Sequence, residues 1–340
     1  MNETVEKIYS IIKDYRYDDG IFITTDDIRS WAEQFGPDAD FILEEFAHIL
    51  PKVYCSRQNA VEIVREFING QYKDYGFGSV EEYLQKTCFL CMQPDGKSQH
   101  VLLSILDEIV FNKVGRHLTD YDHFDKTLYV YLDDVLATGG TIRKDIVSWL
   151  KTDDHAELLK QKKIYLEIAL ICVHTWGLHF MDYGVKKDFG NVNIRKRYAY
   201  VISNHLKLYN QKLNIAIPVK DQPKEVHEYL ASLDATKYED YAYRDANKPE
   251  REVFFTNSDN RVRYENLLLE KGLYIIRQIK DIKANVRPLG MINPNYKTFG
   301  LGTHFFTWRN VPNNCPLVFW WNVEGHNWKP LFPPRRGGAI

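Results

Sequence analysis

The 340-residue sequence has few cysteines and almost no net charge. Its five cysteines are an odd number at irregular spacing, which excludes the disulfide framework of a small secreted protein. Cys88 and Cys91 form a CxxC pair, but a zinc ribbon needs a second ligand pair, so we interpret the cysteines as packed side chains. The formal net charge of -2 provides no global basic field of the kind that attracts nucleic acid.

Long hydrophobic runs are also missing. No stretch approaches the roughly 18 consecutive apolar residues of a membrane-spanning helix, and the N-terminus lacks the basic and apolar segments of a secretory signal. These absences predict a cytoplasmic protein that does not bind a membrane. What is present is an ordinary globular composition, 44% hydrophobic and 26% charged, with enough length for about two domains.

Three regions of different composition follow one another along the chain. Residues 1–75 have apolar side chains at spacings of three and four, residues 76–235 alternate short apolar runs with helical segments, and residues 236–340 end in an aromatic-rich tail. The apolar runs lack polar alternation, which is typical of strands covered on both faces, and they lie at 89–92, 128–132, 164–175 and 198–203. We therefore predict an α/β fold with a mainly parallel sheet, an N-terminal helical domain and a C-terminal aromatic-rich cap.

The N-terminal helices, residues 1–75, have two interpretations. Several short helices with a glycine-containing break are compatible with a helix-turn-helix or winged-helix unit. No helix carries the one-sided Arg/Lys face that enters a nucleic-acid groove, so we favour a helical docking domain for a protein or nucleoprotein partner.

The stretch "YLDDVLATGGT" combines two acids with a turn suited to an anion. Asp133 and Asp134 follow the predicted strand 128–132, and open α/β sheets hold their ligands at the carboxyl ends of strands. The turn offers backbone N–H groups, two hydroxyls and the start of a helix through Ala137, Thr138, Gly139, Gly140 and Thr141. Carboxylates beside an anion site suit ribose hydroxyls or Mg²⁺, so the motif predicts a sugar phosphate.

This motif resembles the signature of type I phosphoribosyltransferases. The resemblance implies that Asp133 and Asp134 contact the ribose hydroxyls of phosphoribosyl pyrophosphate (PRPP) and hold Mg²⁺ through the substrate, and that residues 137–141 wrap its 5-phosphate. It also requires a pyrophosphate loop after an earlier strand, and "PDGKS" fits in order, with the candidates Asp95, Gly96, Lys97 and Ser98. An ordinary helix cap at Ser98 is the alternative.

In this family a variable hood recognises the acceptor that PRPP reacts with. Here residues 236–340 are the candidate hood around a core of residues 76–235, and Arg309 and Asn310 are candidates for an acceptor pocket. The alternative is that the tail is a packed cap, because four of the seven tryptophans fall within it, at positions 308, 320, 321 and 328.

Nearly the whole chain, with "WAEQF" near its start and "RNVPNNCPLVFWW" near its end, also resembles phosphoribosyltransferase-like effectors of bacterial conflict and antiphage systems, including retrons. The resemblance implies a Mg-dependent transferase or hydrolase that acts on a base or nucleotide. A non-catalytic module that senses PRPP or a nucleotide, and docks a nucleic acid or ribonucleoprotein, is the alternative. A homo-oligomer is compatible with either, and the sequence does not choose between them.

Overall fold

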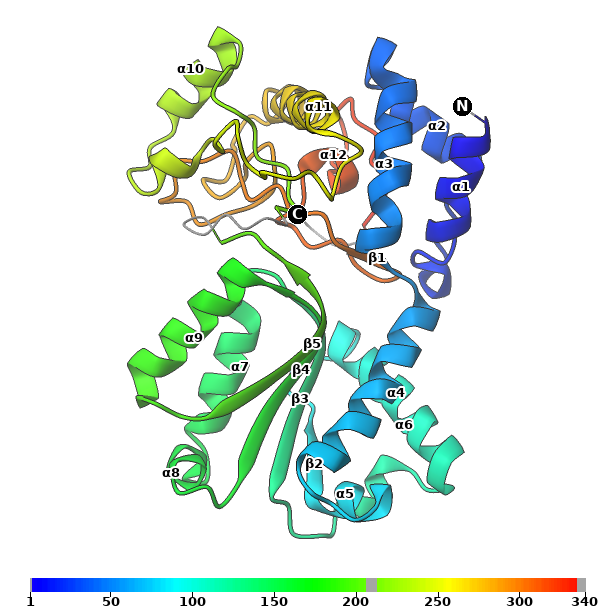
Figure 1. Ribbon diagram of the computed structural model, residues 1–340, viewed down its shortest axis with the longest axis vertical. Coiled ribbons are helices and arrows are strands. Elements are labelled where there is room, and N and C mark those ends of the chain that lie inside the picture. The colour runs from blue at the N-terminus through cyan, green and yellow to red at the C-terminus, as the bar shows by residue number, and fades with distance from the viewer. Residues whose placement is uncertain (1, 206–212, 335–340) are drawn as a thin grey trace. The chain divides into compact units, whose positions relative to one another are not determined.

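The computed structural model of the protein describes residues 2–205 and 213–334 (Figure 1). The chain divides into two compact units. Unit 1 comprises residues 1–56 and 202–340, and unit 2 comprises residues 57–201.

These units have other boundaries than the three predicted domains. The last predicted N-terminal helix, α4 (Arg57–Asp74), belongs to unit 2, where it packs against α6 and β4. The helices before it share one hydrophobic core with residues from the C-terminal part of the chain. Helical periodicity identifies a buried face, but it does not specify which segment covers that face.

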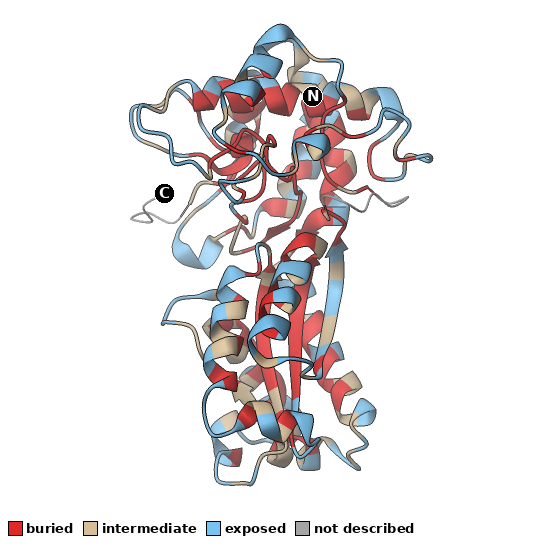
Figure 2. Ribbon diagram, turned by 90° about the vertical axis from the view of Figure 1, so that its left-hand side faces the viewer, coloured by how far each residue is buried: buried red, intermediate tan, exposed pale blue. Residues whose placement is uncertain are grey.

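Unit 2 is built on a four-stranded sheet in the order β2-β3-β4-β5. Its strands are β2 (Thr87–Leu90), β3 (Leu128–Leu136), β4 (Tyr165–His174) and β5 (Ile194–Ile202). The β2–β3 and β3–β4 pairs are parallel, which confirms the predicted α/β fold with a parallel sheet. In β4 every residue after Tyr165 is buried, as expected for a strand with both faces covered (Figure 2).

Helices cover both faces of this sheet. α7 (Gly140–Leu150) and α9 (Thr175–Phe189) pack together on one face, and α4 packs with α6 (Ser98–Val114) on the other (Figure 1). The remaining helical segments of unit 2 are α5 (Val80–Lys86), η3 (Leu118–Tyr121) and α8 (His155–Lys160). No helix in the described ranges is both long and apolar enough to span a membrane.

Unit 1 combines the N-terminal helices with the C-terminal aromatic residues. Its helices are α1 (Asn2–Ile12), η1 (Tyr17–Asp19), α2 (Thr25–Glu33), η2 (Gly36–Asp38), α3 (Ala39–Val53), α10 (Lys224–Ser232), η4 (Glu239–Tyr241), α11 (Ser258–Ile276) and α12 (Leu317–Trp320). A short parallel pair joins β1 (Tyr54–Cys55) to β6 (Phe306–Thr307). In the core, Trp31 stacks on Phe319 and donates its indole N–H to the carbonyl of Val318.

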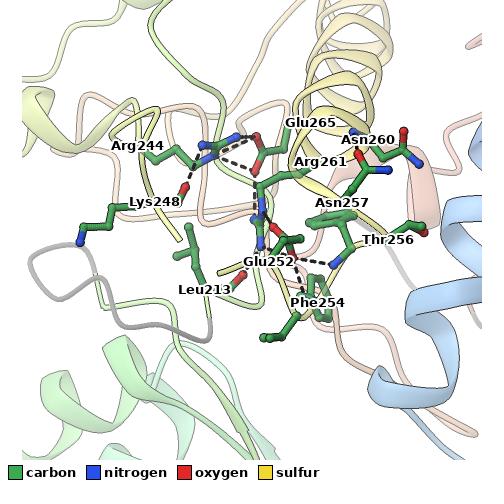
Figure 3. Close-up of polar contacts among 12 residues, drawn as sticks. Leu213, Arg244, Lys248, Glu252, Phe254, Thr256, Asn257, Asn260, Arg261 and Glu265 are labelled. Carbon is green, nitrogen blue, oxygen red and sulfur yellow. Dashed lines mark hydrogen bonds and ion pairs between the residues drawn. The ribbon is translucent and has the colours of Figure 1, made fainter. Parts of the chain in front are cut away.

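A network of buried charges on α11 links distant segments of unit 1 (Figure 3). The guanidinium of Arg261 donates to Glu252 at 2.5 Å and to Glu265 at 3.2 Å, and Arg244 donates to Glu265 at 2.8 Å. Arg261 also donates to the carbonyl of Leu213 at 2.5 Å. Two cations and two carboxylates therefore balance, and of these four residues Arg244, Arg261 and Glu265 are buried while Glu252 is partly exposed.

Candidate ligand-binding site

The two acids of the central motif lie where one strand pairing stops and another continues. β3 extends to Leu136, so Asp133 and Asp134 are part of this strand, whereas the sequence placed them just after it. The β2–β3 pairing ends at Leu90 opposite Tyr131, while β3 remains paired with β4 through Leu136. The acids therefore lie beyond the carboxyl end of β2, in the position where open sheets hold ligands.

Asp133 is a buried carboxylate, 4% exposed, that accepts hydrogen bonds from neutral donors. Its Oδ1 accepts from the hydroxyl of Ser98 at 2.7 Å and from the backbone N–H of Asp134 at 2.9 Å, and its Oδ2 accepts from the amide of Gln93 at 2.6 Å. Burial and the adjacent charge of Asp134 raise the pKa of Asp133 to about 7. Within the described residues no cation pairs with it.

The loop between β3 and α7 touches α9 through two glycines. Gly139 has φ of 78°, and a Cβ there would lie 2.3 Å from the carbonyl oxygen of Gly177. A Cβ on Gly177 would in turn lie 2.2 Å from the carbonyl oxygen of Ala137. Both positions therefore require glycine, for close backbone packing as well as for the turn. The sequence analysis identified Gly139 but not Gly177, whose signal was a glycine inside the helical pattern "TWGLHFMDYG".

The start of α7 faces open space. Its N-cap, Gly139, provides no side-chain hydrogen bond to the first turn, and Thr138, Gly140 and Thr141 are exposed. A Cβ on Gly140 would have its nearest neighbour, the hydroxyl of Thr138, 3.8 Å away. The helix start and the two threonines are thus accessible at this turn, and N–H groups at a helix start are suited to an anion.

The second predicted loop lies beside the first. Asp95, Gly96 and Lys97 are exposed, and Ser98 begins α6, whose N-cap Lys97 provides no side-chain hydrogen bond to the helix. The hydroxyl of Ser98 contacts Asp133 rather than the first turn of its own helix, so the structure does not show the ordinary cap at Ser98. Two helix starts without side-chain caps therefore flank Asp133.

Two residues that position this loop were not predicted from the sequence. Gln99, fully buried on α6, accepts from the backbone N–H groups of Met92 and Gln93 at 2.7 and 3.0 Å. The imidazole of His100 contacts the carbonyl of Gln93 at 2.7 Å. The available signal was a pair of polar residues, Gln99 and His100, at the start of an apolar helix.

The CxxC pair differs in part from the prediction of packed thiols. Both cysteines are free, Cys88 is partly buried, and Cys91 is exposed with its sulfur 3.6 Å from an imidazole nitrogen of His100. Cys91 follows β2 directly, at the start of the loop that leads to α6.

The predicted acceptor residues belong to unit 1, at a turn after β6. The backbone N–H groups of Arg309 and Asn310 donate to the hydroxyl of Thr307 at 3.3 and 3.0 Å, which closes the turn. The four C-terminal tryptophans are buried in this unit, and the indoles of Trp320 and Trp328 donate to backbone carbonyls. This arrangement is that of a packed cap, and the acceptor role of Arg309 and Asn310 stays a prediction.

Comparison with protein families supplies the assignment. The family model of PRTase-CE matches residues 28–334, which include most of both units. This chain belongs to the PRTase-CE family. The resemblance to phosphoribosyltransferase-like effectors of conflict systems is thereby confirmed at the level of the family. No curated protein and no solved structure matched the chain.

For a PRTase-CE protein, the arrangement in unit 2 has a definite chemical capacity. Asp133 and Asp134 are strong acceptors for hydroxyl groups, and the starts of α6 and α7 are suited to negative charge. A molecule with hydroxyls between two anionic groups matches this order of acceptors and donors.

Proposed function

We propose that the sheet edge of unit 2 binds PRPP and that the protein is a phosphoribosyltransferase-like enzyme. The observation that carries this proposal is the placement of Asp133 and Asp134 between the uncapped starts of α6 and α7. PRPP has the matching order of groups, with a ribose diol between a phosphate and a pyrophosphate.

Each part of the site has a proposed role. Residues 137–141 bind the 5-phosphate through backbone N–H groups and hydroxyls, with Gly140 leaving room for the phosphate oxygens. Asp133 and Asp134 accept the ribose hydroxyls. Residues 95–98 bind the pyrophosphate, with the exposed ammonium of Lys97 as the charged donor.

The residues present fit Mg²⁺ when substrate oxygens complete its shell. Among the described residues no group of three His, Cys, Asp or Glu side chains could hold a metal ion. Asp133 and Asp134 supply two carboxylates, and Mg²⁺ is commonly bound by one or two carboxylates together with substrate phosphates. When bound, Mg²⁺ would neutralise the charge of the departing pyrophosphate.

The proposed reaction breaks the bond between the anomeric carbon and the pyrophosphate oxygen. A lone pair of a base, a nucleotide or water forms the new bond to that carbon, the proton of the attacking group passes to solvent, and pyrophosphate leaves with the electron pair of the broken bond. The protein contributes by positioning the sugar and stabilising the charge of the leaving group. Membership of the PRTase-CE family supports an effector role in bacterial antiphage defence for this activity.

A regulatory module that senses PRPP or a nucleotide without chemistry is the second candidate. It is favoured by the contacts of Asp133, whose two oxygens are engaged by Ser98 and Gln93 rather than left open. Such a module would transmit ligand binding to a nucleic acid or ribonucleoprotein docked through residues 1–75.

Calorimetry with PRPP and Mg²⁺ tests both candidates. We expect the wild type to bind and the double variant Asp133→Asn with Asp134→Asn to bind at least about 100-fold more weakly, because hydrogen bonds to two charged acceptors are lost. The matched control carries the same change at two exposed acids of unit 2, Asp122→Asn with Asp125→Asn, and should bind as the wild type does.

An assay of pyrophosphate release with a panel of bases and nucleotides then separates the candidates. Release that depends on Asp133 supports the enzyme. Binding without release supports the sensing module, and an absence of binding to the wild type contradicts both.

A further inference from the structure

Gln93 is bound to the carboxylate that the proposed function assigns to the sugar. Its Nε2 donates to Asp133 Oδ2 at 2.6 Å and to the hydroxyl of Tyr131 at 2.8 Å. Tyr131 in turn donates to Asp145 of α7 at 2.7 Å, so this chain of contacts joins the β2–α6 loop to β3 and α7.

The acceptor capacity of Asp133 is nearly exhausted by protein donors. An ionised carboxylate oxygen accepts about two hydrogen bonds. Oδ1 accepts from Ser98 and from the backbone of Asp134, and Oδ2 accepts from Gln93. With 4% of Asp133 exposed, an incoming hydroxyl meets a carboxylate whose positions are largely taken.

Gln93 is well placed to move without disturbing the loop. Its backbone is fixed by Gln99 and His100, whereas its side chain is partly exposed. Because one Nε2 hydrogen contacts Asp133 and the other contacts Tyr131, the side chain can give up the first contact and keep the second. Moving the amide of Gln93 away from Asp133 therefore costs one hydrogen bond rather than two.

We propose that Gln93 sets the affinity of the site by occupying, on Asp133, the position of a sugar hydroxyl, so that a phosphorylated sugar displaces it on binding. This inference rests on the proposed function, because it assigns Asp133 to the sugar. Gln93 thereby stabilises the ligand-free site and weakens binding of the sugar that displaces it. The residue acts through Asp133 and takes no part in the chemistry.

The variant Gln93→Met tests this role, because methionine keeps the length of the side chain and removes the donor. The wild type gives up a hydrogen bond to a charged group when it binds PRPP, and the variant does not. We expect Gln93→Met to bind PRPP with Mg²⁺ about tenfold more tightly than the wild type in calorimetry. The control Gln161→Met, at an exposed position after α8, should bind as the wild type does.

The outcomes separate this inference from the proposed function. Binding to the wild type that is equal to or tighter than binding to Gln93→Met overturns the role of Gln93 and leaves the proposed function intact. An absence of binding to both overturns the two together.

A second measurement follows binding in the wild type, and a variant serves only to assign one signal. The side-chain amide signal of Gln93 in a nuclear magnetic resonance spectrum, assigned by its absence from Gln93→Met or Gln93→Ala, should move when PRPP and Mg²⁺ are added. An unchanged signal in a protein that binds PRPP contradicts the displacement.

Discussion

Glu265 in unit 1 and Asp133 in unit 2 are both buried carboxylates, 0% and 4% exposed, with different partners. Glu265 is bound by the guanidinium groups of Arg244 and Arg261. Asp133 is bound by a hydroxyl, a side-chain amide and a backbone N–H, and no cation in the described part of the chain pairs with it. Burial raises the pKa of both carboxyls, and at Glu265 the two arginines oppose that effect.

The difference in partners distinguishes Glu265, whose charge is neutralised by its neighbours, from Asp133, whose charge is not. The network around Glu265 balances its charges internally, so it can be maintained by its contribution to the specificity of folding. A buried carboxylate without a counter-charge lowers stability, and removing the charge would be an easy way to raise it. The proposed binding of a sugar by Asp133 would account for a charge that is costly to bury.

Removing one arginine from the balanced network should have the largest effect on stability. Arg261→Met leaves Glu252 without the cation that it is hydrogen-bonded to and leaves Glu265 with Arg244, and it also removes the donor to the carbonyl of Leu213. We expect the free energy of unfolding to fall by about 3–5 kcal/mol, the usual result of breaking a buried ion pair. Urea denaturation followed by tryptophan fluorescence would measure it, since Trp31 and the four C-terminal tryptophans are in unit 1.

The matched control for this variant lies two residues along the same helix. Arg263 pairs with Asp38, and its side chain is 53% exposed. Arg263→Met should lower the free energy of unfolding by less than about 1 kcal/mol, as is typical of exposed ion pairs. Equal losses at Arg261 and Arg263 would contradict the importance of charge balance.

Replacing the carboxylate by an amide should lower the stability of the protein at Glu265 and raise it at Asp133. Glu265→Gln leaves two buried guanidinium groups with one carboxylate, and we expect a loss of about 2–3 kcal/mol. Asp133→Asn removes a charge that has no counter-charge, and we expect a gain of about 2 kcal/mol near pH 8, reduced by the contact that Gln93 must rearrange. Urea denaturation of both variants measures the two signs, and destabilisation by Asp133→Asn would show that this carboxylate is structural.

The sheet and the acid pair could be predicted from the sequence because each leaves a local signal. A strand covered on both faces, such as β4, reads as a continuous apolar run, and the two adjacent aspartates before a Thr/Gly turn form a compact motif. No local signal in the sequence indicates which distant segments together make up each unit. The indole of Trp31 bonds to the carbonyl of Val318, 287 residues away, and amphipathic periodicity does not identify a partner at that distance.

The contacts that control Asp133 could not be predicted for a related reason. Gln93 is a polar residue in a loop, and its role depends on the conformation that Gln99 and His100 impose on that loop. The same limit applies to Gly177, whose need for glycine arises only from the approach of Ala137. A motif identifies residues that are close in the sequence, whereas the contacts of Gln93 and Gly177 form only when the chain folds.

The stability difference between the wild type and Asp133→Asn should depend on pH. The expected change with pH is somewhat smaller than the effects of the substitutions above. The pKa of Asp133 is raised from 3.8 to about 7, so between these values the folded protein holds a proton that the unfolded chain has released. The proton favours folding at low pH, and this contribution is lost as the pH rises through the folded pKa. We expect the advantage of Asp133→Asn to grow by about 1–2 kcal/mol from pH 6 to pH 8 in urea denaturation. A constant advantage would contradict the raised pKa of Asp133.

Mg²⁺ without PRPP should have the smallest effect on the free energy of unfolding. This measurement tests whether Mg²⁺ supplies the counter-charge that Asp133 lacks. Asp133 and Asp134 offer two carboxylates, Asp133 already accepts three hydrogen bonds, and no third ligand gathers with them among the described residues. Millimolar Mg²⁺ alone should therefore raise the free energy of unfolding by less than about 0.5 kcal/mol, equally in the wild type and in Asp133→Asn. In the wild type, PRPP at 100 times the Kd of PRPP, with Mg²⁺ present, should raise it by about 2.7 kcal/mol. Thermal denaturation with EDTA as the metal-free reference measures both. A large increase with Mg²⁺ alone that Asp133→Asn abolishes would mean that the acids hold the cation before the sugar arrives. In that case Asp133 would resemble Glu265, with a metal ion in place of the arginines.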